Sequence, residues 1–119
     1  MIRRFEGIRI FTLNTVMFNR GSALTIPGIG IFLGVKQINN TDLIRHEFGH
    51  ILQYRQKGIL FFWFKIVPVS LLSAFKTLLN KNHIHMHTWT EWSANNLSNI
   101  YFKQPSNWDF KNYPVHSPQ

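Results

Sequence analysis

The chain has 119 residues and a net charge of +8, and 45% of its residues are hydrophobic. This composition excludes a disordered chain and fits a single domain. The absence of cysteine excludes disulfides and thiolate metal sites. The 13 basic residues are scattered, with no block typical of a nucleic-acid arm, so we expect no nucleic-acid partner. Diffuse positive charge favours anionic surfaces in general, including membranes.

The N-terminal residues give the first indication of location. Glu6 and Arg9 interrupt any apolar run, so no secretory signal is recognised. We expect a cytoplasmic or membrane-associated protein. Strands should occupy residues 8–35, with alternation from Ile8, a turn at 27–30 and a short apolar strand at 31–35. These segments predict a small N-terminal β-sheet.

A helix is predicted over 42–56, because an Asn/Thr/Asp cluster at 39–42 can cap its start and Gly58 can end it. This helix carries the motif HExxH at His46, Glu47 and His50. Residues four apart share a helix face, so both imidazoles can bind one zinc ion, with Glu47 beside them as general base. Gly49 within the motif weakens the helix and would be explained by the close approach of another segment.

A zinc site needs a third protein ligand, and the chain contains few acidic residues. Glu91, on a helix predicted over 89–102, is the candidate. An alternative remains open, because Thr88 and Glu91 also fit a capping box, in which Glu91 would bind a backbone N–H. The sequence therefore predicts Zn²⁺ held by His46, His50 and Glu91, with capping as the competing role for Glu91.

Residues 59–79 are strongly apolar and long enough to span a membrane, although Lys65, Pro68 and Lys76 interrupt them. They could contact a membrane surface or pack internally. A second feature is the cluster His83, His85 and His87. On a strand these side chains would point the same way and could hold another metal or stabilise a transition state; otherwise they are polar loop residues.

HExxH followed by a helix carrying ExxA resembles the gluzincin zinc metallopeptidases, which include thermolysin and the CAAX prenyl endopeptidases. The resemblance implies zinc binding by His46, His50 and Glu91, with Glu47 as base. It also implies a polar partner for a zinc histidine at Asn95, where the family usually has Asp. In thermolysin-like enzymes a downstream histidine stabilises the oxyanion, and an edge strand lines the cleft, a place that residues 23–35 would take here.

The combined prediction is an α+β fold with a small N-terminal sheet, an HExxH helix, an apolar helical excursion and a glutamate helix. Residues 1–103 would form a single minimal zincin-like domain, and residues 104–119 an extended C-terminal tail. The expected function is zinc-dependent hydrolysis of a peptide or protein substrate. The alternative is a non-enzymatic or degenerate zinc-binding module associated with a membrane or a protein partner.

Overall fold

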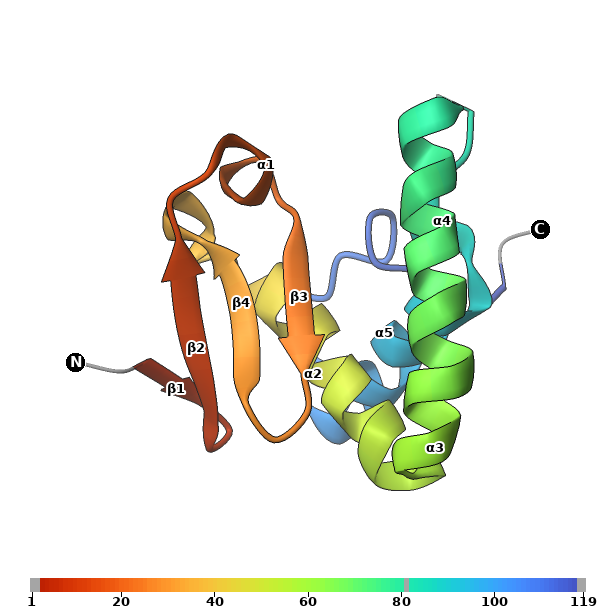
Figure 1. Ribbon diagram of the computed structural model, residues 1–119. Coiled ribbons are helices and arrows are strands. Elements are labelled where there is room, and N and C mark those ends of the chain that lie inside the picture. The colour runs from red at the N-terminus through yellow and green to blue at the C-terminus, as the bar shows by residue number, and fades with distance from the viewer. Residues whose placement is uncertain (1–2, 81, 118–119) are drawn as a thin grey trace.

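The computed structural model of the chain describes residues 3–80 and 82–117. An N-terminal four-stranded sheet is followed by helices, which confirms the predicted α+β layout (Figure 1). The strands are β1 (Arg3–Phe5), β2 (Ile8–Leu13), β3 (Ala23–Ile26) and β4 (Gly30–Gly34). Their order in the sheet is β1-β2-β4-β3; β2 and β4 are parallel, whereas the other two pairs are antiparallel. As a result β3 lies at an edge of the sheet.

Strand β1 was not predicted from the sequence. The prediction of strands over 8–35 is wrong at α1 (Val16–Asn19), a helix too short to show a hydrophobic period. The HExxH helix α2 (Thr41–Lys57) has nearly the predicted bounds. The Asn40 side chain accepts a hydrogen bond from the backbone N–H of Leu43, which caps its first turn. Gly58, at a φ of 89°, ends it.

The sheet packs on α2 through a small apolar core. It contains Ile10 of β2, Ile31 and Leu33 of β4, and Ile44 of α2, all buried. The period of two in the strands and the helical period in α2 place these residues on facing sides. The short 3₁₀ turn η1 (Val35–Gln37) connects the sheet to the helical half.

Residues 59–79 form a continuous helical segment of α3 (Ile59–Phe61), a π-helical stretch η2 (Phe62–Ile66) and α4 (Val67–Leu79). By length and composition alone, this segment could cross a membrane, which is weak support for membrane contact. It does not form a buried core helix, because only 17% of its most apolar window is buried. The alternative of complete internal packing therefore does not describe the structure.

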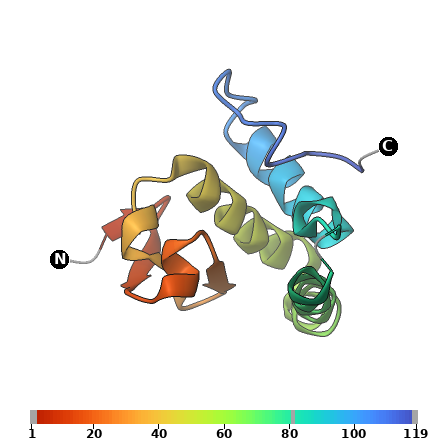
Figure 2. The same ribbon diagram turned by 90° about the horizontal axis from the view of Figure 1, so that it is seen from above.

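Helix α5 (Trp89–Tyr101) crosses α2 at very short range, and α2 lies between the sheet on one side and α4 and α5 on the other (Figure 2). A Cβ atom added to Gly49 would lie 2.1 Å from the carbonyl oxygen of Ala94. Ala94 is itself fully buried. Close contact with α5 therefore explains the glycine inside the HExxH motif.

Residues 104–117 contain no helix or strand and return toward α2 and α5. Trp108 is buried, and its indole N–H donates to the carbonyl of Tyr113 at 2.9 Å. The Tyr113 ring lies 5.9 Å from the ring of His46. This C-terminal segment thus contacts the helix that carries the HExxH motif.

The contact at Gly49 predicts that Gly49→Ala destabilises the protein. Alanine at an ordinary helix position would stabilise it by up to about 1 kcal/mol, but here the methyl group meets backbone that cannot rotate away. We expect a loss of about 1–3 kcal/mol or more in urea unfolding of the metal-free chain. The control is Gln56→Ala, an exposed position on α2, which should change stability by less than about 0.5 kcal/mol. Equal stability of the two variants would contradict the close packing.

Candidate metal centre

Three side chains meet between α2 and α5. His46 and His50 lie one turn apart on α2, Glu91 lies in the first turn of α5, and all three are buried. Nε2 of His46 is 3.0 Å, and Nε2 of His50 is 3.2 Å, from the same Glu91 oxygen, Oε1. Among the described residues these three offer ligand atoms that all lie within 4.8 Å of one another, so the group could hold a metal ion.

Glu91 does not cap α5. Thr88, the N-cap residue, has no side-chain capping bond, and its hydroxyl contacts Ser73 instead. The second carboxylate oxygen of Glu91, Oε2, accepts hydrogen bonds from the hydroxyls of Ser70 and Thr90. The Glu91 carboxylate therefore points into the cluster with one oxygen facing both imidazoles, and the capping-box alternative is wrong.

A hydrogen bond at Nδ1, the ring nitrogen that does not face Glu91, orients each histidine. Nδ1–H of His46 donates to Oδ1 of Asn95 at 2.7 Å, and Nδ1–H of His50 donates to Oε1 of Gln53 at 2.7 Å. In these tautomers both Nε2 lone pairs face the Glu91 carboxylate. Three electron pairs directed at one another in a buried space require a cation between them. That cation is either a proton or a metal ion.

The distances fit a metal ion. Ligands held tetrahedrally at 2.0–2.1 Å from zinc lie roughly 3.3 Å from one another. The separations of 3.0 Å and 3.2 Å from Glu91 Oε1 to the two Nε2 atoms are close to that value. Little rearrangement is therefore needed to place an ion among the three atoms.

In the metal-free chain a proton takes the place of the cation. Burial by itself would lower the pKa of His50, but the charge and hydrogen bond of Glu91 outweigh it and raise the pKa to about 9. Burial would raise the pKa of Glu91, but the positive charge of His50 and the imidazoles of His46, His50 and His85 within hydrogen-bond distance hold it well below its usual value. The metal-free site is thus a buried ion pair.

Asn95 has a second partner that explains why it is not an aspartate. Its Nδ2–H donates to the carbonyl of Pro114 at 2.9 Å, while its Oδ1 accepts from His46. An aspartate would place a carboxylate oxygen against that carbonyl, leaving two acceptors without a proton between them. The C-terminal segment thus fixes the amide of Asn95, and through it the ring of His46.

Glu47 lies beside the cluster and its two oxygens differ in their contacts. Oε1 accepts a hydrogen bond from the hydroxyl of Thr25 on β3 at 2.7 Å. Oε2 lies 3.7 Å from Nε2 of His46. One oxygen is therefore anchored to the edge strand, and the other faces the atom that would bind the metal.

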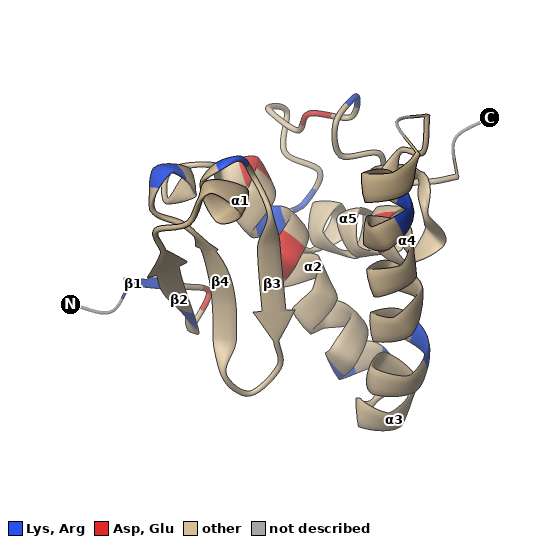
Figure 3. Cartoon of the chain, turned by 45° about the horizontal axis from the view of Figure 1, so that its top comes forward, with Lys and Arg blue, Asp and Glu red and all other residues tan. Residues whose placement is uncertain are grey.

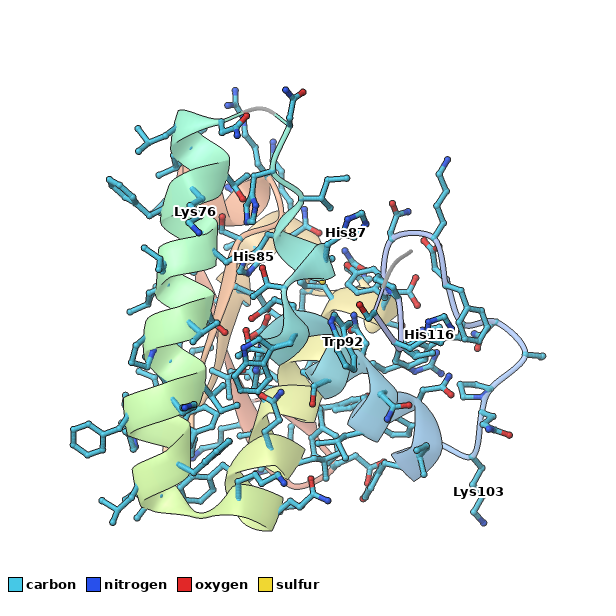
Figure 4. All side chains as sticks on the ribbon, turned by 90° about the vertical axis from the view of Figure 1, so that its right-hand side faces the viewer. Lys76, His85, His87, Trp92, Lys103 and His116 are labelled. Carbon is cyan, nitrogen blue, oxygen red and sulfur yellow. The ribbon has the colours of Figure 1, made fainter. Side chains whose placement is uncertain are left out.

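The side chains of His83, His85 and His87 do not all point the same way, because residues 85–87 form the 3₁₀ turn η3 and not a strand. Nε2 of His85 lies 3.2 Å from Glu91 Oε1, and its Nδ1 lies 2.8 Å from the hydroxyl of Ser73. His83 contacts the same hydroxyl at 2.9 Å. His87 is exposed, on the side of η3 away from α4 (Figure 4). Of the three, only His85 is within contact distance of a candidate metal ligand, Glu91.

A cavity of about 370 Å³ opens onto these residues. Its walls are the edge strand β3, including Leu24 and Thr25, and the apolar helix, including Ser70 and Leu71. The residues of its floor are His46, Glu47, His50, His85 and Glu91. The candidate metal ligands and Glu47 are therefore accessible from the cavity.

Two residues around the site were not predicted from the sequence. Gln53 is buried, accepts from His50 and donates through its Nε2–H to the carbonyl of Thr90 at 2.7 Å. Its position, three residues after His50 on the same helix face, was a usable signal. Thr25 gave no local signal, because its contact with Glu47 joins positions 22 residues apart.

Comparison with known proteins gave no match to a family model, to a curated protein or to a solved structure.

The ion pair of the metal-free site predicts that metal binding is coupled to proton release. With a His50 pKa of about 9, the imidazole must lose its proton before Nε2 can bind Zn²⁺. Between pH 6.5 and 9 we expect release of about one proton per chain, and an affinity that falls about tenfold for each pH unit lowered. Calorimetric titration with Zn²⁺ in buffers of different ionisation enthalpy measures both. A pH-independent affinity across this range would contradict the assignment of His50 as a ligand.

Proposed function

We propose that this chain is a zinc-dependent metallopeptidase of gluzincin type. The observation that carries the proposal is the convergence of His46, His50 and Glu91, with Glu47 beside them and an accessible cavity. A site with purely structural metal is closed and has no use for a base, whereas Glu47 has one oxygen directed at the cluster.

The donor set suits zinc or iron(II), and the HExxH arrangement of the two histidines with Glu47 beside them favours zinc. Two imidazoles and one carboxylate suit zinc. An iron–sulfur centre needs thiolates and a calcium site needs several oxygen ligands, and this cluster offers neither. Zinc at this position would supply a Lewis acid that polarises a carbonyl and lowers the pKa of water to about 7. With His46, His50 and Glu91 as its protein ligands, such an ion would be accessible to water or substrate from the cavity.

In this proposal the chain's own residues position the reactants. Glu47 accepts the proton of the attacking water through Oε2, while Thr25 holds Oε1. Among the described residues β3 has a neighbouring strand on one side only, and it borders the cavity, so an extended peptide could add to it as a further strand. His85, at the cavity floor, would donate to a developing oxyanion only through Nε2, the nitrogen that now contacts Glu91 Oε1, because its Nδ1 contacts the hydroxyl of Ser73.

The proposal predicts the behaviour of Glu47→Gln. Glutamine keeps the shape of the side chain but removes its basicity, so zinc content and folding should be unchanged. Hydrolysis of an unstructured, fluorescence-quenched peptide library should fall by at least about 100-fold. The measurements are peptide cleavage and elemental analysis of the same preparation.

His46→Ala is the comparison for that experiment, because it should lose both metal and activity. Equal cleavage by wild type and Glu47→Gln would disprove the mechanism. If both bind zinc and neither cleaves any peptide, the chain is a non-enzymatic or degenerate zinc-binding module instead.

A second prediction concerns Thr25 as a positioning residue. Thr25→Val preserves the strand and the volume but removes the hydroxyl that holds Glu47. We expect kcat to fall by about tenfold or more, the cost of losing one hydrogen bond to a charged group, with zinc content and KM little changed. Thr25→Ser retains the hydroxyl and should restore most of the activity. Equal loss in the serine and valine variants would show that Thr25 acts by packing alone.

A further inference from the structure

The helical segment 59–79 has an outer side that no described residue covers. Its exposed large apolar residues form a band along α4 and the preceding π-helical stretch. We define this apolar face as Phe64, Leu71, Leu72, Phe75, Leu78 and Leu79. Phe64, Leu71, Phe75 and Leu78 are spaced by seven, four and three residues, which places them on one side of a helix. A contiguous apolar face of this length on a protein surface indicates an interaction site.

The opposite side of the same helix is polar and attached to the candidate metal centre. Ser70 donates to Glu91, and Ser73 is buried and contacts both His83 and His85. Phe62 and Ile66, the buried apolar residues of the π-helical stretch, complete this inner side. The helix therefore has two distinct faces, of which the inner one is fixed to the protein.

The charges around the apolar face all have one sign. The charged residues of the segment are Lys65 and Lys76, both exposed, and Lys57 lies just before it (Figure 3). No acidic residue occurs between Glu47 and Glu91 in the sequence. Lysine side chains beside an apolar helix face can extend toward a negatively charged surface while their methylenes cover apolar area.

We propose that the apolar face binds the surface of an anionic phospholipid bilayer, with α4 lying in the interface. Apolar side chains enter the boundary between headgroups and acyl chains, and the lysines contact anionic headgroups. The opening of the cavity, which Leu71 also lines, then lies at the membrane surface. This binding is independent of the proposed hydrolysis and can be tested without it.

The inner face argues for an interfacial helix and against a spanning one. A span would expose Ser70 and Ser73 to hydrocarbon after breaking their bonds to Glu91 and the histidines. The lysines argue against a second copy of the chain as the occupant. In a symmetric dimer the same face meets itself, and the basic residues beside it would meet without acidic partners on this face.

The test uses the full chain with two kinds of vesicle at low salt. One kind contains phosphatidylcholine alone, and the other contains phosphatidylcholine with phosphatidylserine. We expect sedimentation with the anionic vesicles, weaker binding to the neutral ones, and release as salt is raised. Trp63, partly exposed beside the apolar face, should shift its fluorescence to the blue, and Trp63→Phe should bind without most of that shift.

Two exposed apolar residues provide a matched pair of variants. Phe75 on the apolar face is 56% exposed, and Ile100 on α5 is 57% exposed. Phe75→Glu should weaken vesicle binding by about tenfold or more, whereas Ile100→Glu should leave it unchanged. Lys65→Glu and Lys76→Glu should each weaken binding to anionic vesicles by about fivefold or more. Circular dichroism of each variant verifies the fold.

Four results would overturn the proposal. The first is no binding to anionic vesicles at low salt, and the second is equal binding to neutral and anionic vesicles. The third is equal weakening of binding by Phe75→Glu and Ile100→Glu. The fourth is that alkaline carbonate fails to release the bound protein from the vesicles. The last would indicate a spanning helix. A wild-type dimer in solution that Phe75→Glu dissociates, together with absence of vesicle binding, would assign the face to a second copy.

Discussion

The contact between α2 and α5 is the constraint on which the candidate site depends. Glu91 reaches both histidines only because the two helices approach closely, and they approach closely because Gly49 has no side chain and Ala94 a small one. The usual cost of glycine in a helix is thus offset by a contact that no other residue permits. Each helix therefore carries candidate metal ligands and, close to them, a small residue at the helix contact. These are His46, His50 and Gly49 in the HExxH helix, and Glu91 and Ala94 in the ExxA helix.

The same contact buries several polar groups, which must satisfy one another. Gln53 joins His50 to the backbone of α5, and Asn95 joins His46 to the C-terminal segment. Each amide uses its oxygen for an imidazole and its nitrogen for a carbonyl, so both ends are satisfied. The result is a network that holds both imidazole rings by their Nδ1–H groups, with each Nε2 directed at Glu91. Such preorganisation reduces the reorganisation that ion binding requires.

The sequence was sufficient for the elements and ligands whose signals are local. Helix α2, helix α5 and the strands after Ile8 follow from capping residues and periodicity, and the group that could hold a metal ion, His46, His50 and Glu91, was predicted from HExxH and the scarcity of acids. Long-range contacts were not predictable in this way. The bond from Thr25 to Glu47 joins a strand to a helix, and the role of Pro114 depends on how the last residues fold back. The departure of Asn95 from the gluzincin pattern has its physical reason in that second contact.

The apolar helix connects the candidate metal centre to the exposed apolar face. Its inner serines bond to Glu91 and the histidines, so any movement of the helix changes the surroundings of the candidate ligands. Its outer face exposes large apolar side chains to solvent, and this exposure contributes nothing to the stability of a soluble monomer. Both faces belong to the same helical segment, so binding at the outer apolar face would also restrain the position of the inner serines. A surface that held this helix would therefore also hold one wall of the cavity and the second oxygen of Glu91.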